Sequence, residues 1–129
     1  LNLPTFFGIF YADGRRKPAA QAFPLWNAMS TASEKLRIST GIPLLDRTPD
    51  IKGELAPLWM LAGRTPSGNI LLLLSNISEQ TISYDISVGQ PAQSLTITEV
   101  KGQSSAQTNT RNGPSASIDP LCVQLIEIH

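Results

Sequence analysis

The sequence predicts a mainly β protein: an antiparallel β-sandwich of the Greek-key type, preceded by one strand and one α-helix. Three observations lead to this fold class. Short apolar or alternating segments with turn residues between them fill most of the chain after residue 58. A single segment, around Trp26, has the spacing of an amphipathic helix. The 129 residues are enough for one domain with a hydrophobic core.

The stretch Leu58–Asn76 forms the centre of the predicted fold. Two leucine-rich runs flank Thr65-Pro66-Ser67-Gly68, and a proline followed by glycine is typical of a turn between strands. We therefore expect a β-hairpin. Its second arm, Ile70–Leu74, is apolar at every position, whereas a strand with one face in water would alternate. Both faces of this strand should be covered.

The chain before this hairpin predicts a strand and then a helix. Thr5–Tyr11 is aromatic and β-prone, and it ends at the turn residues Ala12-Asp13-Gly14. The helix that follows should run to about Ala32, with Pro24 producing a kink, unless the helix begins near Phe23. Its apolar face is expected to contain Ala19, Ala22, Phe23, Trp26 and Met29.

Three further segments are expected to form strands. Leu36–Leu45 should form one strand, or two short strands broken at Gly41 and Pro43. Thr81–Val88 alternates cleanly and predicts a half-buried strand. Ser94–Val100 alternates in the same way through Leu95 and Ile97. Val100 would join the same apolar face after a slip of one position.

The C-terminal quarter of the chain contains one polar and one apolar segment. Gln103–Ser115 has no aliphatic side chain larger than alanine, so we expect a mobile loop or an irregular edge. Leu121–Ile128 is apolar at both odd and even positions and predicts a second central strand.

Composition excludes several classes of function. Ten basic residues balance ten acidic ones, so nucleic acid and membrane surfaces are not expected partners. His129 is the only histidine, which leaves no Ser-His-Asp triad and no histidine metal site; we expect no metal and no cofactor.

Cys122, the only cysteine, lies in an apolar segment and should be a small buried residue. Asn76-Ile77-Ser78 matches a glycosylation acceptor, a pattern that is common by chance.

Part of the sequence resembles a known enzyme family. Gly8–Trp26, GIFYADGRRKPAAQAFPLW, is similar to the last strand and last helix of the (β/α)8 barrel in clan A glycoside hydrolases, with Lys-Pro-Ala and Ala-Phe-x-Leu in register. Leu58–Asn76 and Val123–Ile128 resemble the β-sandwich that closes many such enzymes, family 39 being the nearest. Pro24 departs from the polar residue usual in that helix. The resemblance divides the chain into residues 1–35, a strand–helix remnant of the barrel, and residues 36–129, the sandwich.

The resemblance implies a non-catalytic piece of a larger enzyme. Retaining glycosidases need two carboxyl groups roughly 5 Å apart, and in clan A the acid usually follows an asparagine. No Asn-Glu pair occurs in this chain, and its acidic residues are scattered over turns and polar strand faces. The implied role is that of a C-terminal sandwich that packs against and stabilises a (β/α)8 catalytic domain absent from this chain. The parent enzyme would be xylosidase-like and hydrolyse O-glycosidic bonds.

Carbohydrate binding by the sandwich itself is the alternative function. Exposed aromatic side chains would then stack on the rings of a polysaccharide or oligosaccharide. Trp59, enclosed by Leu58 and Met60, is expected in the core, so Tyr11 at the end of the barrel strand and Asp13 in the turn after it are the candidate sugar contacts. Self-association through the edge of Thr5–Tyr11, or through an exposed apolar flank, is a further expectation because unpaired strand edges associate.

Overall fold

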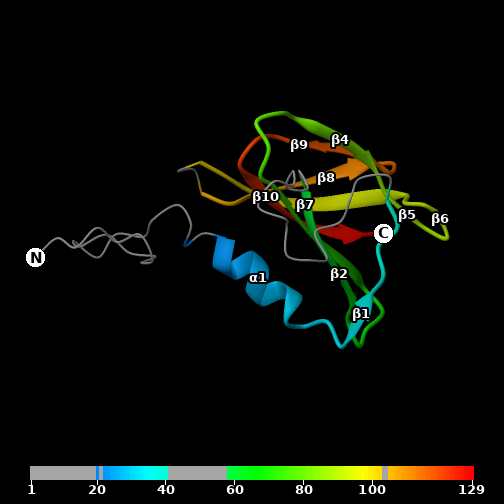
Figure 1. The fold of residues 1–129 in the computed structure, drawn as a ribbon. Coiled ribbons are helices and arrows are strands. Elements are labelled where there is room, and N and C mark those ends of the chain that lie inside the picture. The colour runs from blue at the N-terminus through cyan, green and yellow to red at the C-terminus, as the bar shows by residue number, and fades with distance from the viewer. Residues whose placement is uncertain (1–19, 21, 41–57, 103–104) are drawn as a thin grey trace, which may run out of the picture.

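The computed structural model describes residues 20, 22–40, 58–102 and 105–129. The strand predicted at Thr5–Tyr11 lies outside these residues. The described part contains one helix and ten strands (Figure 1): α1 Phe23–Met29, β1 Glu34–Leu36, β2 Leu58–Arg64, β3 Ile70–Asn76, β4 Ile82–Asp85, β5 Ser87–Val88, β6 Gln90–Pro91, β7 Ser94–Lys101, β8 Gln107–Asn112, β9 Ser115–Ile118 and β10 Cys122–Ile128. No helix of this part has the length and apolar character needed to cross a membrane.

The strands form an antiparallel, sandwich-like arrangement, as the sequence predicts. Six strands make the main sheet in the order β1-β2-β3-β10-β7-β8, and every neighbouring pair is antiparallel. The second layer is the pair β4-β9, and β5-β6 forms a small separate hairpin. Figure 1 shows α1 and the β4-β9 pair on opposite sides of the main sheet.

The predicted central hairpin is confirmed. β2 and β3 pair along their whole lengths, and β10 pairs with the other side of β3, so that β3 and β10 lie in the middle of the sheet. In the turn, the N–H of Gly68 donates to the carbonyl of Thr65 at 2.9 Å. Gly68 has φ +92°, a conformation that favours glycine. The second central strand, β10, is also confirmed.

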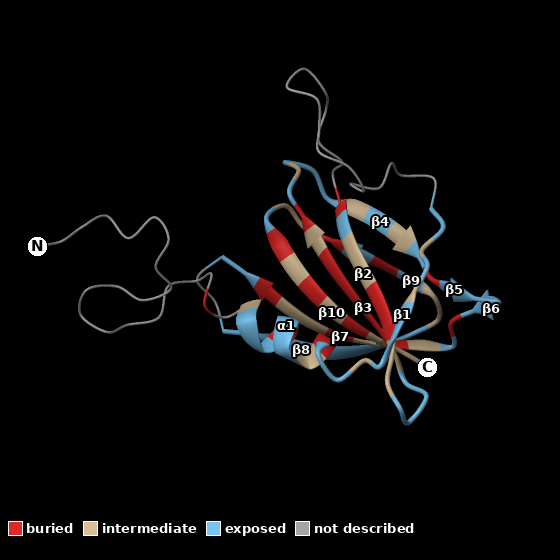
Figure 2. Cartoon of the chain, turned by 60° about the horizontal axis from the view of Figure 1, so that its bottom comes forward, coloured by how far each residue is buried: buried red, intermediate tan, exposed pale blue. Residues whose placement is uncertain are grey.

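Alternating residues of β3 are buried against two different layers, which explains its unbroken apolar run. Leu72 and Leu74 face the interior of the sandwich, whereas Leu71 and Leu73 pack with side chains of α1. Figure 2 shows the buried residues concentrated on these central strands. Because each fully buried leucine contributes about 1.5–3 kcal/mol, this strand supplies a large share of the stability of the fold.

The helix begins at Phe23, the alternative start expected from the sequence, and it ends at Met29, short of the predicted end near Ala32. Pro24 occupies its first turn, where a missing N–H is tolerated. The predicted apolar face is wrong in part: Leu25 and Met29 are buried against the sheet, whereas Phe23 and Trp26 are exposed. In so short a helix, two residues spaced by four positions define the face that contacts the sheet.

The strand predicted at Leu36–Leu45 is wrong for residues 37–40. β1 ends at Leu36, residues 37–40 have no regular structure, and the following residues lie outside the described part. Ile38 packs against the sandwich core from irregular backbone. Side-chain burial here does not depend on strand pairing.

The prediction for Thr81–Val88 needs a correction. The segment is divided into β4 and β5, because Ile86 turns into the core and its N–H donates to the carbonyl of Pro114 at 3.0 Å. Val88 is therefore exposed in the small hairpin instead of half-buried. The slip predicted at Val100 does not occur: β7 pairs with β10 without interruption, so Val100 lies on the helix side of the sheet while Leu95 and Ile97 face the interior.

The polar segment after residue 103 forms a regular edge strand, so the predicted loop is wrong. Every residue of β8 is exposed, yet the strand pairs with β7 over six positions. Threonine side chains face each other across this pair, with 3.0 Å between the hydroxyl oxygens of Thr98 and Thr108. Backbone hydrogen bonds and cross-strand pairs form this strand without burial of apolar side chains.

Candidate functional site

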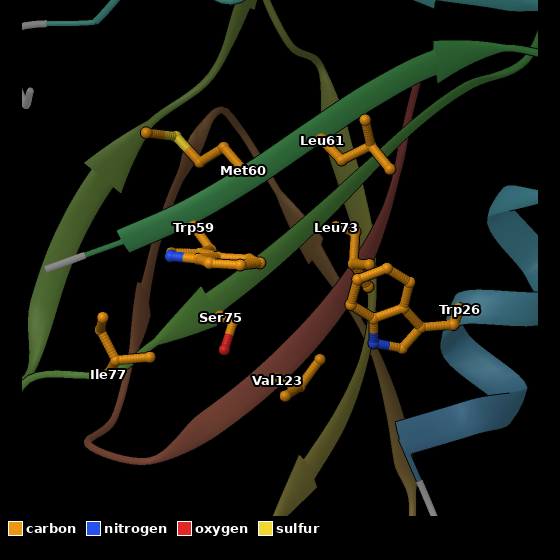
Figure 3. A pocket seen from close by; sticks show the side chains of 8 residues that line it. All are labelled: Trp26, Trp59, Met60, Leu61, Leu73, Ser75, Ile77 and Val123. Atoms are coloured by element: carbon orange, nitrogen blue, oxygen red, sulfur yellow. The ribbon is translucent and has the colours of Figure 1, made fainter. Parts of the chain in front are cut away.

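An apolar groove lies on the helix side of the main sheet, beside α1. Its floor is formed by β2, β3 and β10, and α1 borders it at one end (Figure 3). The groove has a volume of about 330 Å³. We call it the tryptophan groove and define it by its lining residues: Trp26, Trp59, Met60, Leu61, Leu73, Ser75, Ile77 and Val123.

Strand register explains why side chains from three strands meet here. Ser75 pairs with Trp59 on one side and with Val123 on the other, and directly paired residues in an antiparallel sheet point to the same face. These three residues therefore form a row across β2, β3 and β10. Figure 3 shows Trp26 reaching in from α1, with Leu73 next to it, and Trp59 on β2, with Ser75 next to it.

The groove is open to solvent although its lining is almost wholly apolar. Trp26 is 51% exposed, Trp59 48% and Ile77 41%. None of the lining residues is charged, and the polar side-chain groups among them are the Ser75 hydroxyl and the indole N–H groups of Trp26 and Trp59. Exposed apolar surface of this kind is typical of an interface that another molecule or domain covers.

The exposure of Trp59 contradicts the prediction that it belongs to the core. Alternation along β2 places Leu58 in the sandwich interior and Trp59 on the helix side. Helix α1 has seven residues and is about 10 Å long, whereas the seven residues of β2 extend for about 23 Å. The helix is therefore too short to cover the whole strand, and the end that carries Trp59 is left open.

Four of the described carboxylate side chains, those of Glu34, Asp85, Glu99 and Asp119, take part in structural contacts. Asp119 accepts hydrogen bonds from Lys101 at 2.6 Å and from Thr81 at 3.1 Å. These contacts lower the pKa of the Asp119 carboxyl, the hydrogen bond from Lys101 having the largest effect. A glycosidase proton donor needs a raised pKa. Asp119 is therefore not poised to protonate a leaving group.

Cys122 belongs to a buried polar cluster between the layers. The thiol is fully buried and donates to Glu99 at 3.0 Å, and burial together with this hydrogen bond raises its pKa. The protonated thiol is a poor nucleophile, which agrees with the predicted role of a small buried side chain. Within the described residues, no group of three or more His, Cys, Asp and Glu side chains could hold a metal ion.

The two candidate sugar contacts named from the sequence, Tyr11 and Asp13, lie outside the described residues. The structure instead brings together Trp26 and Trp59. The sequence predicted Trp26 on the apolar face of the helix and Trp59 in the core. The length of the helix could have indicated their exposure, because the alternative start at Phe23 shortens α1 and leaves part of the sheet uncovered.

Two solved structures are similar to this chain. A GH30 endoxylanase from Clostridium papyrosolvens C71 matches 100% of the chain with a TM-score of 0.60 and 12% sequence identity, over 31% of its own length. The catalytic domain of GH30 xylanase C from Talaromyces cellulolyticus matches 60% of the chain with a TM-score of 0.48 and 15% identity, over 19% of its own length. No protein-family model and no curated protein sequence matches this chain. The chain thus spans about a third or less of these two proteins, and its fold is one that occurs within a GH30 endoxylanase.

Proposed function

We propose that this chain is the non-catalytic C-terminal sandwich of a glycoside hydrolase, and that it packs against a (β/α)8 catalytic domain and stabilises it. The observation that carries the proposal is the open, charge-free tryptophan groove beside α1. The parent enzyme would hydrolyse O-glycosidic bonds, with xylosidase-like activity. The catalytic carboxylates would belong to the barrel.

The orientation of α1 supports this role. Its residues resemble the last helix of a clan A barrel, and it uses Leu25 and Met29 to hold the sheet. Its other side presents Phe23 and Trp26 to solvent. A helix with apolar residues on both sides is suited to lie between two packed layers. The sandwich would be one of these layers and the barrel the other.

The fold comparison supports the same origin. The endoxylanase from Clostridium papyrosolvens C71 contains the fold in 31% of its length, which leaves more than two-thirds of that enzyme for other parts. A (β/α)8 barrel needs about 250 residues. The neighbours belong to family 30, whereas the sequence resemblance named family 39. We therefore place the proposal at the level of clan A.

The proposal is tested by reading the coding sequence immediately upstream of this chain. We expect roughly 250 residues or more of alternating strands and helices, the length of a (β/α)8 barrel, with an Asn-Glu pair near the end of a central strand. An upstream stop codon in the same frame, or an unrelated domain, would contradict the proposal.

Carbohydrate binding is the second candidate, and the exposure of Trp26 and Trp59 favours it. Sugar rings stack on tryptophan faces, but ligand sites also place polar groups to orient the ligand. For this purpose the groove offers the Ser75 hydroxyl and two indole N–H groups, and no charged or amide side chain. Titration of the chain with soluble xylan, followed by tryptophan fluorescence, separates the two functions. A saturable change indicates sugar binding, and we expect none.

A further inference from the structure

We infer that the strand β8 is an interface through which two copies of this chain pair, edge to edge and antiparallel, into one continuous sheet. β8 is the last strand of the main sheet within the described part of the chain, and all of its residues are exposed. An edge strand offers a row of unpaired backbone N–H and C=O groups to another strand. The inference goes beyond the proposed function and does not depend on it.

The hydrogen-bonding pattern shows which backbone groups of β8 face the open edge. Ser94 on β7 donates its N–H to the carbonyl of His129 at 3.4 Å and accepts from the N–H of His129 at 3.0 Å. The next residue, Leu95, therefore turns its backbone groups to the other side, toward its partner Arg111 on β8. Alternation along β8 then turns the backbone groups of its even-numbered residues to the open edge: Thr108, Thr110 and Asn112.

β8 lacks most of the features by which natural edge strands avoid pairing. It contains no proline and no lysine, and it pairs with β7 at consecutive positions without a bulge. The opposite edge of the main sheet, β1, is better protected, because it has only three residues and Lys35 is the middle one. Pairing of β8 with β1 of another copy is therefore disfavoured. Two β8 strands related by a two-fold axis form a closed dimer instead of a filament.

One antiparallel register makes the two β8 strands complementary. With the two-fold axis at Asn109, Thr108 lies opposite Thr110 of the second copy, and both residues turn their backbone groups to the interface. Arg111, the only charged residue of β8, then lies opposite Gln107 of the second copy, whose amide oxygen can accept from the guanidinium. The two arginines do not face each other. A shift of one residue would place inward-turned backbone groups opposite outward-turned ones.

The threonine pairs of β7 and β8 continue across the dimer in this register. Within one copy, the hydroxyl oxygens of Thr98 and Thr108 are 3.0 Å apart, and those of Thr96 and Thr110 are 3.4 Å apart. Pairing of Thr108 with Thr110 of the second copy joins these pairs into rows that cross all the strands at the interface, and cross-strand threonine pairs stabilise a sheet. The net charge of the chain is zero, so no long-range repulsion separates the copies.

Disulfide cross-linking tests the register. Asn109→Cys places a thiol at the two-fold axis, where opposite residues that are not directly hydrogen-bonded have Cα atoms about 4.5 Å apart, within the range of a disulfide. Gln107→Cys is the control, because Gln107 is also exposed but lies opposite Arg111 of the second copy. The native Cys122 is buried. We expect oxidation to form covalent dimers of Asn109→Cys at least about tenfold faster than dimers of Gln107→Cys. Equal rates would overturn the inference.

Thr110→Pro tests the interface without a cysteine. The N–H of Thr110 points to the open edge, so proline leaves the hydrogen bonds to β7 in place and is tolerated on an edge strand. Thr110→Lys, which brings two like charges to the interface, is the second variant. Urea denaturation establishes which variants are folded. In light scattering we expect the unmodified chain to approach twice its monomer mass as its concentration rises to about 1 mM, and the folded variants to stay monomeric.

Two results would overturn the inference. One is an unmodified chain that remains monomeric at about 1 mM. The other is a dimer that persists in the folded Thr110 variants, which is the behaviour expected of association through the tryptophan groove.

Discussion

The phenolic hydroxyl of Tyr84 on β4 donates a hydrogen bond of 2.7 Å to the side-chain oxygen of Gln124 on β10, and this contact joins the two layers of the sandwich. Gln124 is buried, and its amide nitrogen donates to the carbonyl of Ser117 on β9 at 3.0 Å. Both ends of the glutamine side chain are therefore satisfied in the interior. Each contact comes from the opposing layer, so the pair specifies how the layers face each other.

Replacing Tyr84 with phenylalanine tests how much this hydrogen bond contributes to the free energy of unfolding. The change leaves the buried oxygen of Gln124 without its donor, so the free energy of unfolding should fall by about 1–3 kcal/mol. Urea denaturation of the two proteins measures the difference. The control is Ser83→Ala at an exposed position on the same strand, where a change below about 0.5 kcal/mol is expected. Equal losses in the two variants would argue against the contact.

Stability should fall at alkaline pH because of two buried groups. Burial raises the pKa of Tyr84, and burial with the hydrogen bond to Glu99 raises the pKa of Cys122. In the unfolded chain these groups lose protons near pH 10 and pH 8.5, while the folded protein retains them. The unfolded state is therefore favoured increasingly as pH rises above 8.5, by at most about 1.4 kcal/mol per pH unit for each group.

Urea midpoints measured from pH 7 to roughly pH 10.5 check this dependence, since the range spans both unfolded-state pKa values. Cys122→Ala should remove the earlier part of the decline and leave the part above pH 10 that belongs to Tyr84. A midpoint that stays constant over the whole range would show that neither group keeps its proton in the folded protein.

The turn between β9 and β10 contains an unfavourable backbone conformation that can be relieved. Leu121 has φ 54° and is 76% exposed, directly after Pro120. A left-handed conformation costs an ordinary residue about 1–2 kcal/mol, and asparagine tolerates it better. Leu121→Asn should therefore stabilise the protein by about 0.5–1 kcal/mol, measured by thermal unfolding. Leu121→Ala keeps the Cβ atom and should give no such gain; an equal gain would contradict the explanation.

Gly63 on β2 allows the segment after α1 to approach the sheet closely. A Cβ atom at this position would lie 2.6 Å from the Cβ of Ala32 and 3.2 Å from the carbonyl oxygen of Glu34. Gly63→Ala should lower the free energy of unfolding by about 1–3 kcal/mol through overpacking. Adding Ala32→Gly removes the closest contact and should restore part of the loss, as a double-mutant cycle would show. An unaffected single variant would mean that the two segments separate at little cost.

Asn76 is a buried residue whose side chain links neighbouring segments through hydrogen bonds, so we do not expect it to be a glycosylation site. Its amide nitrogen donates to the carbonyls of Gln80, Ile118 and Asp119 at 2.8–3.1 Å, and its oxygen accepts from the N–H and hydroxyl of Ser78. Asn76→Ala should cost about 2–3 kcal/mol because several buried groups lose partners. Mass spectrometry of protein secreted from a eukaryotic host should show no glycan on the folded chain. Uniform glycosylation would contradict the buried position.

Much of the fold could be predicted because burial leaves a pattern in the sequence. The unbroken apolar run of β3 indicated a strand covered on both faces, and the structure covers it with α1 and with the β4-β9 layer. At Val100 the expectation was wrong: the sequence predicted a slip, whereas strict alternation along β7 places this side chain on the other face. The strand β8 left no such pattern, because it is exposed throughout and is formed by pairing with β7.

The candidate site could not be predicted in the same way. Trp59 lies in an apolar run, and its exposure depends on how far α1 extends over the sheet, which is a property of the packed structure. The bond between Tyr84 and Gln124 joins positions 40 residues apart, and no local pattern indicates it. Tertiary packing decides both features, whereas sequence periodicity reports only which face of a strand a residue occupies.

The central proposal is that this chain is a non-catalytic scaffold and that another domain supplies the catalytic acids. The most direct measurement is the release of reducing sugar from xylan by the purified 129-residue chain, beside the same chain extended by its upstream coding region. We predict no release by the 129-residue chain and hydrolysis by the extended protein. Turnover by the 129-residue chain alone would contradict the claim.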